Sequence, residues 1–297
     1  MNYPYAARAV ILAFGSFFFL YAAFGLAVAA VPKRWICERL SPRSAASLLV
    51  ALRFLPVLCA LSLIAGVVIP AFLQGELATG AETVGWFMTL AAAAGVSLWI
   101  QSLVRSARAL YAVRRLQGPE RQYVLETGDP FLAVTGIRRP HIVVSRGFLE
   151  AIPAEQQEVA MRHEMAHFRA ADNLKRLLML LAPPLAFAAL EQSWARYAER
   201  AADDRAVQGD PERAALLAEV LLRVARSRAK TSPVLASALV GSASEIHARV
   251  ERLLAPQRQA DHSFSLLLLA PLLLTACLAA QGATESLFTL LERLLHT

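Results

Sequence analysis

The sequence predicts a multi-pass α-helical membrane protein with a mixed α/β domain in the cytoplasm, and three observations lead to this fold class. First, apolar residues make up 57% of the 297 residues and charged residues only 18%, whereas average soluble domains hold about 45–50% and about 25%. Second, four apolar segments are long enough to cross a bilayer, which takes about 20 residues. Third, the cations are distributed unevenly between the loops that join these segments.

The predicted spans lie towards the two ends of the chain. They cover residues 9–31, 54–73, 84–100 and 263–280. The first lacks a small-residue cleavage site close behind a short apolar core, so it is interpreted as a membrane anchor and not as a removed signal peptide. Trp86 and Trp99 bracket the third span at the depth of the membrane interface.

The cations predict the orientation. The second loop carries Glu76 and Glu82, whereas positive charge gathers in the first loop and after the third span, at Lys33, Arg34, Arg39, Arg43, Arg105, Arg108, Arg114, Arg115 and Arg121. Because positive loops stay in the cytoplasm, the N-terminus is expected outside a bacterial inner (plasma) membrane. The sequence is therefore divided into three spans within 1–104, a cytoplasmic domain over 105–261, and a fourth span with a short extracytoplasmic tail over 262–297.

The net charge of +7 does not indicate a nucleic-acid-binding protein. The basic residues lie beside apolar runs, and none of the basic stretches is interleaved with aromatic residues, so no direct contact with nucleic acid is expected. Cys37, Cys59 and Cys277 are scattered along the chain. They are interpreted as buried structural thiols and indicate neither a disulfide framework nor a thiolate metal site.

The cytoplasmic domain is predicted to begin with short strands and to continue with helices. Runs rich in β-formers and broken by glycine and proline cover residues 122–125, 131–134 and 141–145. Pro153 followed by Glu155 indicates the start of a helix, which is expected to reach about Ala170. Further helices are predicted over residues 193–207, 210–229 and 243–254.

The chemistry centres on His163-Glu164-Met165-Ala166-His167 in the first of these helices. Residues i and i+4 share one face of a helix, so both imidazoles can reach one ion. Glu164 is rotated by about 100° from His163, which places its carboxylate near a water at that ion. Two neutral imidazoles leave a zinc site open, and the carboxylate can act as general base. The competing interpretation is a helix that carries two histidines by accident.

A third ligand is expected from Glu199-Arg200-Ala201-Ala202-Asp203. Glu199 and Asp203 lie one helical turn apart, so Glu199 can ligate while Asp203 accepts an imidazole N–H and fixes the tautomer. By itself this pair is better explained as a solvated helix face. After a two-histidine motif, it favours a zinc site made of His163, His167 and Glu199.

The apolar segment 177–190, with Pro183-Pro184 in its middle, separates the two motifs. If it crossed the membrane, Glu199 would lie on the opposite side from the histidines. Apolar stretches of about 10–14 residues are more often re-entrant, interfacial or core segments, and two prolines favour a bend. The segment is therefore predicted to be a re-entrant hairpin, with a packed core helix as the alternative.

These motifs resemble those of gluzincin membrane peptidases, in particular the peptidase domains of antirepressor-type β-lactam sensor-transducers. The resemblance covers about the first 255 residues and rests on the His163–His167 motif, Asp172-Asn173, Glu199-x-x-Ala202-Asp203 and the approach over residues 136–147. It implies a zincin-like metallopeptidase fold. It also implies His163, His167 and Glu199 as zinc ligands, Glu164 as the base, and Asp203 as a residue that supports a ligand. Asp172 matches as well, and either supports the site or ends the helix.

The chain departs from these relatives after its last predicted span. Sensor-transducers carry a large extracellular penicillin-binding domain there, whereas this sequence holds about 17 residues, too few to fold a sensor. Direct antibiotic sensing is therefore not expected.

The resemblance implies a zinc metalloendopeptidase in signal transduction that cleaves a cytoplasmic polypeptide, such as a transcriptional repressor or the chain itself. One alternative is a quality-control or processing protease for membrane proteins. Another is a non-catalytic zinc-binding membrane scaffold, which the intact Glu164 and a set of three ligands argue against, since structural zinc sites are usually closed by four. The sequence leaves the oligomeric state open, including a homo-oligomer.

Two further expectations concern the surroundings of the site. The substrate is expected to lie extended along an exposed edge strand, for which residues 141–145 are the candidate. His247, Arg249 and Arg252 on the last predicted helix could help an oxyanion or the substrate, but are better explained as a solvated helix face.

Overall fold

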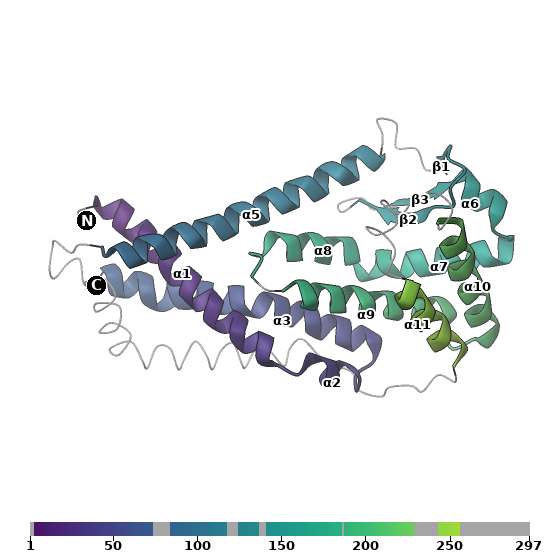
Figure 1. The fold of residues 1–297 in the computed structure, drawn as a ribbon, viewed down its shortest axis with the longest axis horizontal. Helices are drawn as coiled ribbons and strands as arrows, with labels where there is room; N and C mark the ends of the chain where they lie inside the picture. Colours follow the sequence, from purple (N-terminus) through teal and green to yellow (C-terminus); the bar gives the residue numbers. More distant parts are fainter. Residues whose placement is uncertain are drawn as a thin grey trace.

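The computed structural model describes residues 3–73, 84–117, 124–136, 141–185, 187–228 and 243–255, and this part is mostly helical with one small sheet. Figure 1 shows two regions along the long axis of the molecule. One is formed by the long helices α1 (Tyr5–Ala30), α3 (Pro42–Leu63) and α5 (Trp86–Gln117), with the short α2 (Lys33–Cys37) near the end of α1. The other holds the sheet and most of the shorter helices.

Three helices in the described residues are long and apolar enough to cross a membrane: Tyr5–Ala30, Pro42–Leu73 and Trp86–Ala112. The second includes a π-helical turn, η1 (Ile64–Val68). The second and third extend well beyond the predicted apolar segments, because the backbone stays helical past Arg53 and Arg105. The first begins four residues before its predicted span and ends one residue before the predicted end. The fourth predicted span, residues 263–280, lies outside the described residues, as does Cys277.

Two glycines let α1 and α5 approach closely. A Cβ atom at Gly95 would lie 2.5 Å from the carbonyl oxygen of Phe14, and one at Gly15 would lie 2.4 Å from Sδ of Met88. Small residues at such crossings allow van der Waals contact between backbones, which is a main source of helix association in lipid. The close pairing of α1 and α5 therefore depends on glycine, which has no side chain, at positions 15 and 95.

The sheet has the strand order β1-β3-β2. Strand β3 (His141–Ser145) pairs in parallel with β1 (Val124–Leu125) and antiparallel with β2 (Leu132–Thr135). The prediction that residues 141–145 form an exposed edge strand is therefore wrong, since they form the central strand, with Val143 only 1% exposed. The order of strands in a sheet depends on long-range pairing, which the composition of each strand does not reveal.

The remaining helices surround the sheet and extend back towards the membrane helices (Figure 1). They are α6 (Arg146–Ala151), α7 (Ala154–Ala170), α8 (Asp172–Leu181), α9 (Ala188–Val207), α10 (Pro211–Arg228) and α11 (Ala243–Leu254). The predicted helices correspond to α7, α9, α10 and α11, and the largest difference is that α9 begins five residues earlier than residue 193.

The apolar segment 177–190 doubles back. Helix α8 ends at Leu181, Pro183 and Pro184 follow without helical structure, and α9 begins at Ala188. Figure 1 shows α8 and α9 running in opposite directions, so the chain returns towards α7. The depth of this hairpin in a bilayer stays a prediction.

Helix α9 belongs to two hydrophobic cores. Its first half contributes Leu190, Trp194 and Ala198 to the core that holds the buried residues of the membrane helices. Its last turn contributes Ala206 and Val207 to a second core, which contains residues of α7, α10 and α11. One continuous helix therefore connects the packing of the membrane region with that of the sheet region.

Helices α7 and α8 are separated by one residue, Ala171, whose backbone is left-handed, with φ 53° and ψ 39°. This conformation costs an L-residue roughly 1–2 kcal/mol, which glycine avoids. We therefore expect Ala171→Gly to raise the thermal melting temperature of the purified chain by a few degrees, about 2–4 °C per kcal/mol in a protein of this size. Ala170→Gly, one position earlier in helical backbone, should lower it. An unchanged or lower melting temperature for Ala171→Gly would contradict this interpretation of the turn.

Candidate metal centre

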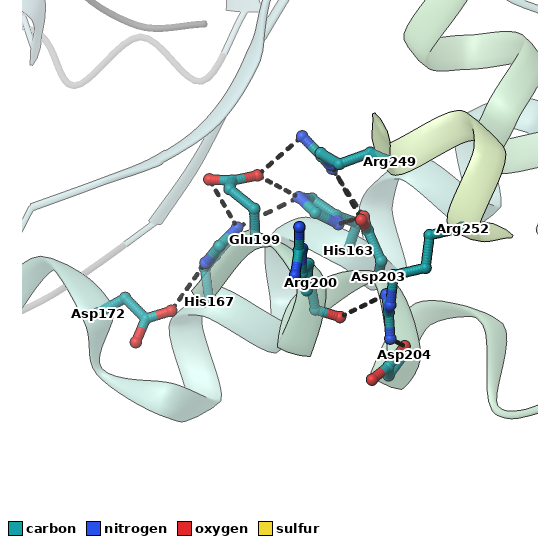
Figure 2. A network of polar contacts seen from close by, with 9 residues as sticks. All are labelled: His163, His167, Asp172, Glu199, Arg200, Asp203, Asp204, Arg249 and Arg252. Carbon is teal, nitrogen blue, oxygen red and sulfur yellow. Dashed lines mark hydrogen bonds and ion pairs between the residues drawn. The ribbon is translucent and has the colours of Figure 1, made fainter. Parts of the chain in front are cut away.

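Helices α7 and α9 bring three metal-binding side chains together, His163, His167 and Glu199 (Figure 2). The two Nε2 atoms of the histidines lie 3.2 Å apart. Oε2 of Glu199 lies 3.5 Å from Nε2 of His163, and Oε1 lies 3.6 Å from Nε2 of His167. The i, i+4 spacing places the imidazoles on one face of α7, and the α8–α9 hairpin returns the glutamate to them.

The spacing of these donor atoms fits a zinc ion. Zinc bonds to nitrogen and oxygen of about 2.0–2.1 Å in a tetrahedron place neighbouring donor atoms about 3.3 Å apart. The two Nε2 atoms, 3.2 Å apart, are close to that value, and each lies 3.5 or 3.6 Å from a different oxygen of Glu199. With one ligand atom from each residue, the three atoms lie within 4.8 Å of one another. Three protein donors leave a fourth position for water or substrate, as in catalytic and not structural zinc sites.

Each imidazole has a carboxylate at its other nitrogen. Nδ1 of His167 lies 2.8 Å from Oδ2 of Asp172, at the first residue of α8. Nδ1 of His163 lies 3.1 Å from Oδ1 of Asp203, although the angle falls short of a strict hydrogen bond. Carboxylates in these positions favour the proton on Nδ1 and leave the Nε2 lone pairs facing each other. Two lone pairs at this distance repel each other unless a proton or a metal ion lies between them.

The electrostatics of the cluster also favour a cation. Burial lowers the pKa of His167, but contacts with Asp172 and Glu199 outweigh it and raise the pKa to about 10. Burial also lowers the pKa of His163, but the contacts with Asp203 and Glu199 outweigh this effect, so the pKa is raised. Partial burial acts to raise the pKa of Glu199, yet the histidines and Arg249 hold it well below its usual value. Without a metal, the two imidazoles bind protons readily, and a metal ion would displace those protons.

Arg249 on α11 joins the centre. Its Nε and Nη2 lie 2.9 and 2.6 Å from the two oxygens of Asp203, and its Nη1 lies 3.0 Å from Oε2 of Glu199. Asp203 is fully buried and the Arg249 side chain is only 15% exposed. Burial alone would lower the pKa of Arg249, but the carboxylates of Asp203, Glu199 and Glu164 raise it. The interpretation of Arg249 as part of a solvated face is therefore wrong.

The neighbours of Arg249 on α11 differ in their surroundings. Arg252 pairs with Asp204 and contacts the carbonyl oxygen of Arg200, so it too is engaged, whereas the side chain of His247 is 73% exposed, as predicted. A signal for Arg249 was present in the sequence. Ile246, Val250 and Leu253 form the buried face of α11, and Arg249 lies three residues after Ile246, on that same face.

Glu164 is held at the edge of the sheet. Its Oε2 accepts the backbone N–H of Val134 on β2 at 3.0 Å. The amide of Asn173 on α8 donates to the carbonyl oxygens of Val134 and Gly136, at 3.0 and 3.2 Å. Strand β2 is thus the strand that faces the metal centre, and Asn173 links it to α8.

The comparison with known protein families decides the identity of this fold. The model of the BlaR1 peptidase M56 family matches residues 83–253, more than half of the chain. The chain belongs to the M56 family. No curated protein and no solved structure matches it.

Membership in the M56 family accounts for the combination of elements described above. The matched residues run from the start of the third membrane helix to the end of α11 and include every residue of the metal centre. M56 proteins are membrane metallopeptidases, which agrees with the three apolar helices and with the spacing of the donor atoms. The resemblance predicted from the motifs is confirmed.

Proposed function

We propose that this M56 protein is a zinc metalloendopeptidase of the bacterial cytoplasmic membrane that cleaves a cytoplasmic regulatory protein, such as a transcriptional repressor, in signal transduction. The observation that carries the proposal is the cluster of His163, His167 and Glu199, whose ligand atoms lie within 4.8 Å of one another, with Glu164 on the helix that carries the two histidines. The cytoplasmic location is supported by two cation-bearing segments, α2 and the end of α5. Both lie on the side of the apolar helices that is nearer the sheet (Figure 1), and positively charged segments next to spans stay in the cytoplasm.

His163, His167 and Glu199 would hold the zinc ion, and Asp203 and Asp172 would orient the two imidazoles. When bound, zinc supplies Lewis acidity, which polarises the scissile carbonyl and makes water a stronger acid. Glu164 accepts a proton from the attacking water while the oxygen of that water bonds to the carbonyl carbon. Glu164 then donates that proton to the amine nitrogen as the C–N bond breaks.

The substrate backbone is proposed to lie along β2, and not along β3 as the sequence suggested. In the antiparallel pair of β2 and β3, alternate residues point their N–H and C=O groups away from the partner strand. Val134 does so, because its N–H and C=O contact Glu164 and Asn173. By alternation, Leu132 offers the same groups on that edge, where an extended peptide can pair without much sequence selection.

Removal and return of the metal tests this function. The full chain, purified in detergent, is expected to contain about one zinc ion per molecule and to cleave a candidate repressor, first one encoded beside it. Chelation should abolish cleavage and added zinc should restore it, whereas magnesium should not, because imidazole ligands favour zinc. Cleavage that persists in the zinc-free protein would refute the proposal. Cleavage of misfolded membrane proteins alone would assign the enzyme to quality control.

A further inference from the structure

A buried arginine in the second membrane helix binds the turn between α8 and α9. Arg53 lies on α3, and its side chain is 0% exposed. Its Nη2 lies 3.1, 2.9 and 3.1 Å from the carbonyl oxygens of Met179, Ala182 and Pro183. These carbonyls belong to the end of α8 and the residues after it, where backbone acceptors lack partners within the helix and where a cation is favourable.

The same guanidinium reaches α9 and the first membrane helix. Its Nε lies 2.9 Å from Oε1 of Glu191, and its Nη1 donates to the hydroxyl of Tyr21 at 3.3 Å. The Tyr21 hydroxyl in turn donates to the carbonyl oxygen of Pro183. Arg105 on α5 binds the other carboxylate oxygen of Glu191 at 3.2 Å. One network, fully buried at Arg53 and partly buried at Glu191 and Arg105, thus joins α1, α3 and α5 to the hairpin.

Three groups of the metal centre lie on the two helices that this hairpin joins. Asp172 begins α8, and Glu199 and Asp203 lie on α9. Glu199 follows Glu191 by eight residues, about 12 Å along one continuous helix. The histidines lie on α7, which contributes to the second core but not to the core of the membrane helices. Because α7 shares that second core with only the last turn of α9, a displacement of the hairpin is expected to shift Glu199 relative to His163 and His167.

We propose that Arg53 is a positioning residue for the metal centre, which couples the packing of the membrane helices to the placement of Glu199. Ionisable residues within membrane helices are rare and are paired when they occur, which makes a buried arginine with five acceptors a functional feature. The proposal rests on the metal centre described above but not on the identity of any substrate.

The test measures metal binding by the full chain in detergent. We expect Arg53→Gln and Glu191→Gln to lower zinc affinity by about tenfold, the lower end of the effect of residues that orient metal ligands. Arg53→Lys keeps the positive charge but loses the planar guanidinium with its several N–H donors, so its zinc affinity should lie between those of Arg53→Gln and wild type. When cobalt replaces zinc, the visible absorption spectrum of both variants should differ from that of wild type. The spectrum reports the geometry of the metal ligands, so it would detect a shift of Glu199.

Ile64→Ala is the matched control, since Ile64 is buried in the same core about three turns further along. It should lower the melting temperature and leave zinc affinity unchanged. The proposal is wrong if folded Arg53→Gln binds zinc with wild-type affinity and an unchanged cobalt spectrum, or if Ile64→Ala loses zinc equally. If Arg53→Gln does not fold, Glu191→Gln and Tyr21→Phe decide by the same criteria. A wild-type chain that binds no zinc would instead refute the metal centre itself.

Discussion

Glu164→Gln is expected to lower the rate of peptide cleavage by about 10²–10⁴-fold, the contribution of a well-placed general base. An amide cannot take a proton from water at neutral pH, so the attack loses its base. The amide oxygen can still accept the N–H of Val134, which the carboxylate now binds at 3.0 Å. The variant should therefore keep its fold and its zinc, measured by circular dichroism and by metal analysis.

The matched control is Glu158→Gln, on the same helix and largely exposed, where the carboxylate pairs with Arg162. Exposed pairs of this kind contribute about 1 kcal/mol or less, so its cleavage rate should equal that of wild type. A Glu164→Gln variant that cleaves as fast as wild type would refute the assignment of the base. A variant without zinc would show that Glu164 is needed to form the metal centre.

Arg249→Ala is expected to destabilise the folded chain by about 3–5 kcal/mol, the range for removal of one partner from a buried ion pair. The change leaves the carboxylate of Asp203, which is fully buried, without its two guanidinium contacts. It also removes the contact that Nη1 makes with Glu199 at 3.0 Å. Denaturant or thermal unfolding of the purified chain would measure the loss.

Two further variants separate charge burial from loss of packing. Arg252→Ala, on the same helix, removes a pair in which Arg252 is 29% and Asp204 30% exposed, so it should destabilise the chain less than Arg249→Ala, whose partner Asp203 is fully buried. The double variant Arg249→Ala with Asp203→Asn should recover part of the stability, because a neutral amide is less costly to bury unpaired than a carboxylate. Equal losses for Arg249→Ala and Arg252→Ala would contradict a special role for the Arg249–Asp203 pair.

Features that depend on neighbours along the chain were predictable. Hydropathy over about 20 residues located the three described helices that are long and apolar enough to cross a membrane, because the length of a span is set by the bilayer whatever its partners are. The i, i+4 spacing placed His163 and His167 on one face of α7, since helix geometry alone sets that relation. Pro183-Pro184 indicated a bend for a similar reason, because proline cannot continue a helix.

Features that depend on distant segments required the tertiary structure. The sequence by itself determined which residues could bind a metal, but the return of α9 decided that Glu199 lies within 3.6 Å of both histidines. Strand order placed residues 141–145 at the centre of the sheet. The contacts of Arg249 and Arg53 likewise join segments 32 to 138 residues apart. Local patterns restrict conformation within a few turns, whereas these partners are chosen by the packing of whole elements.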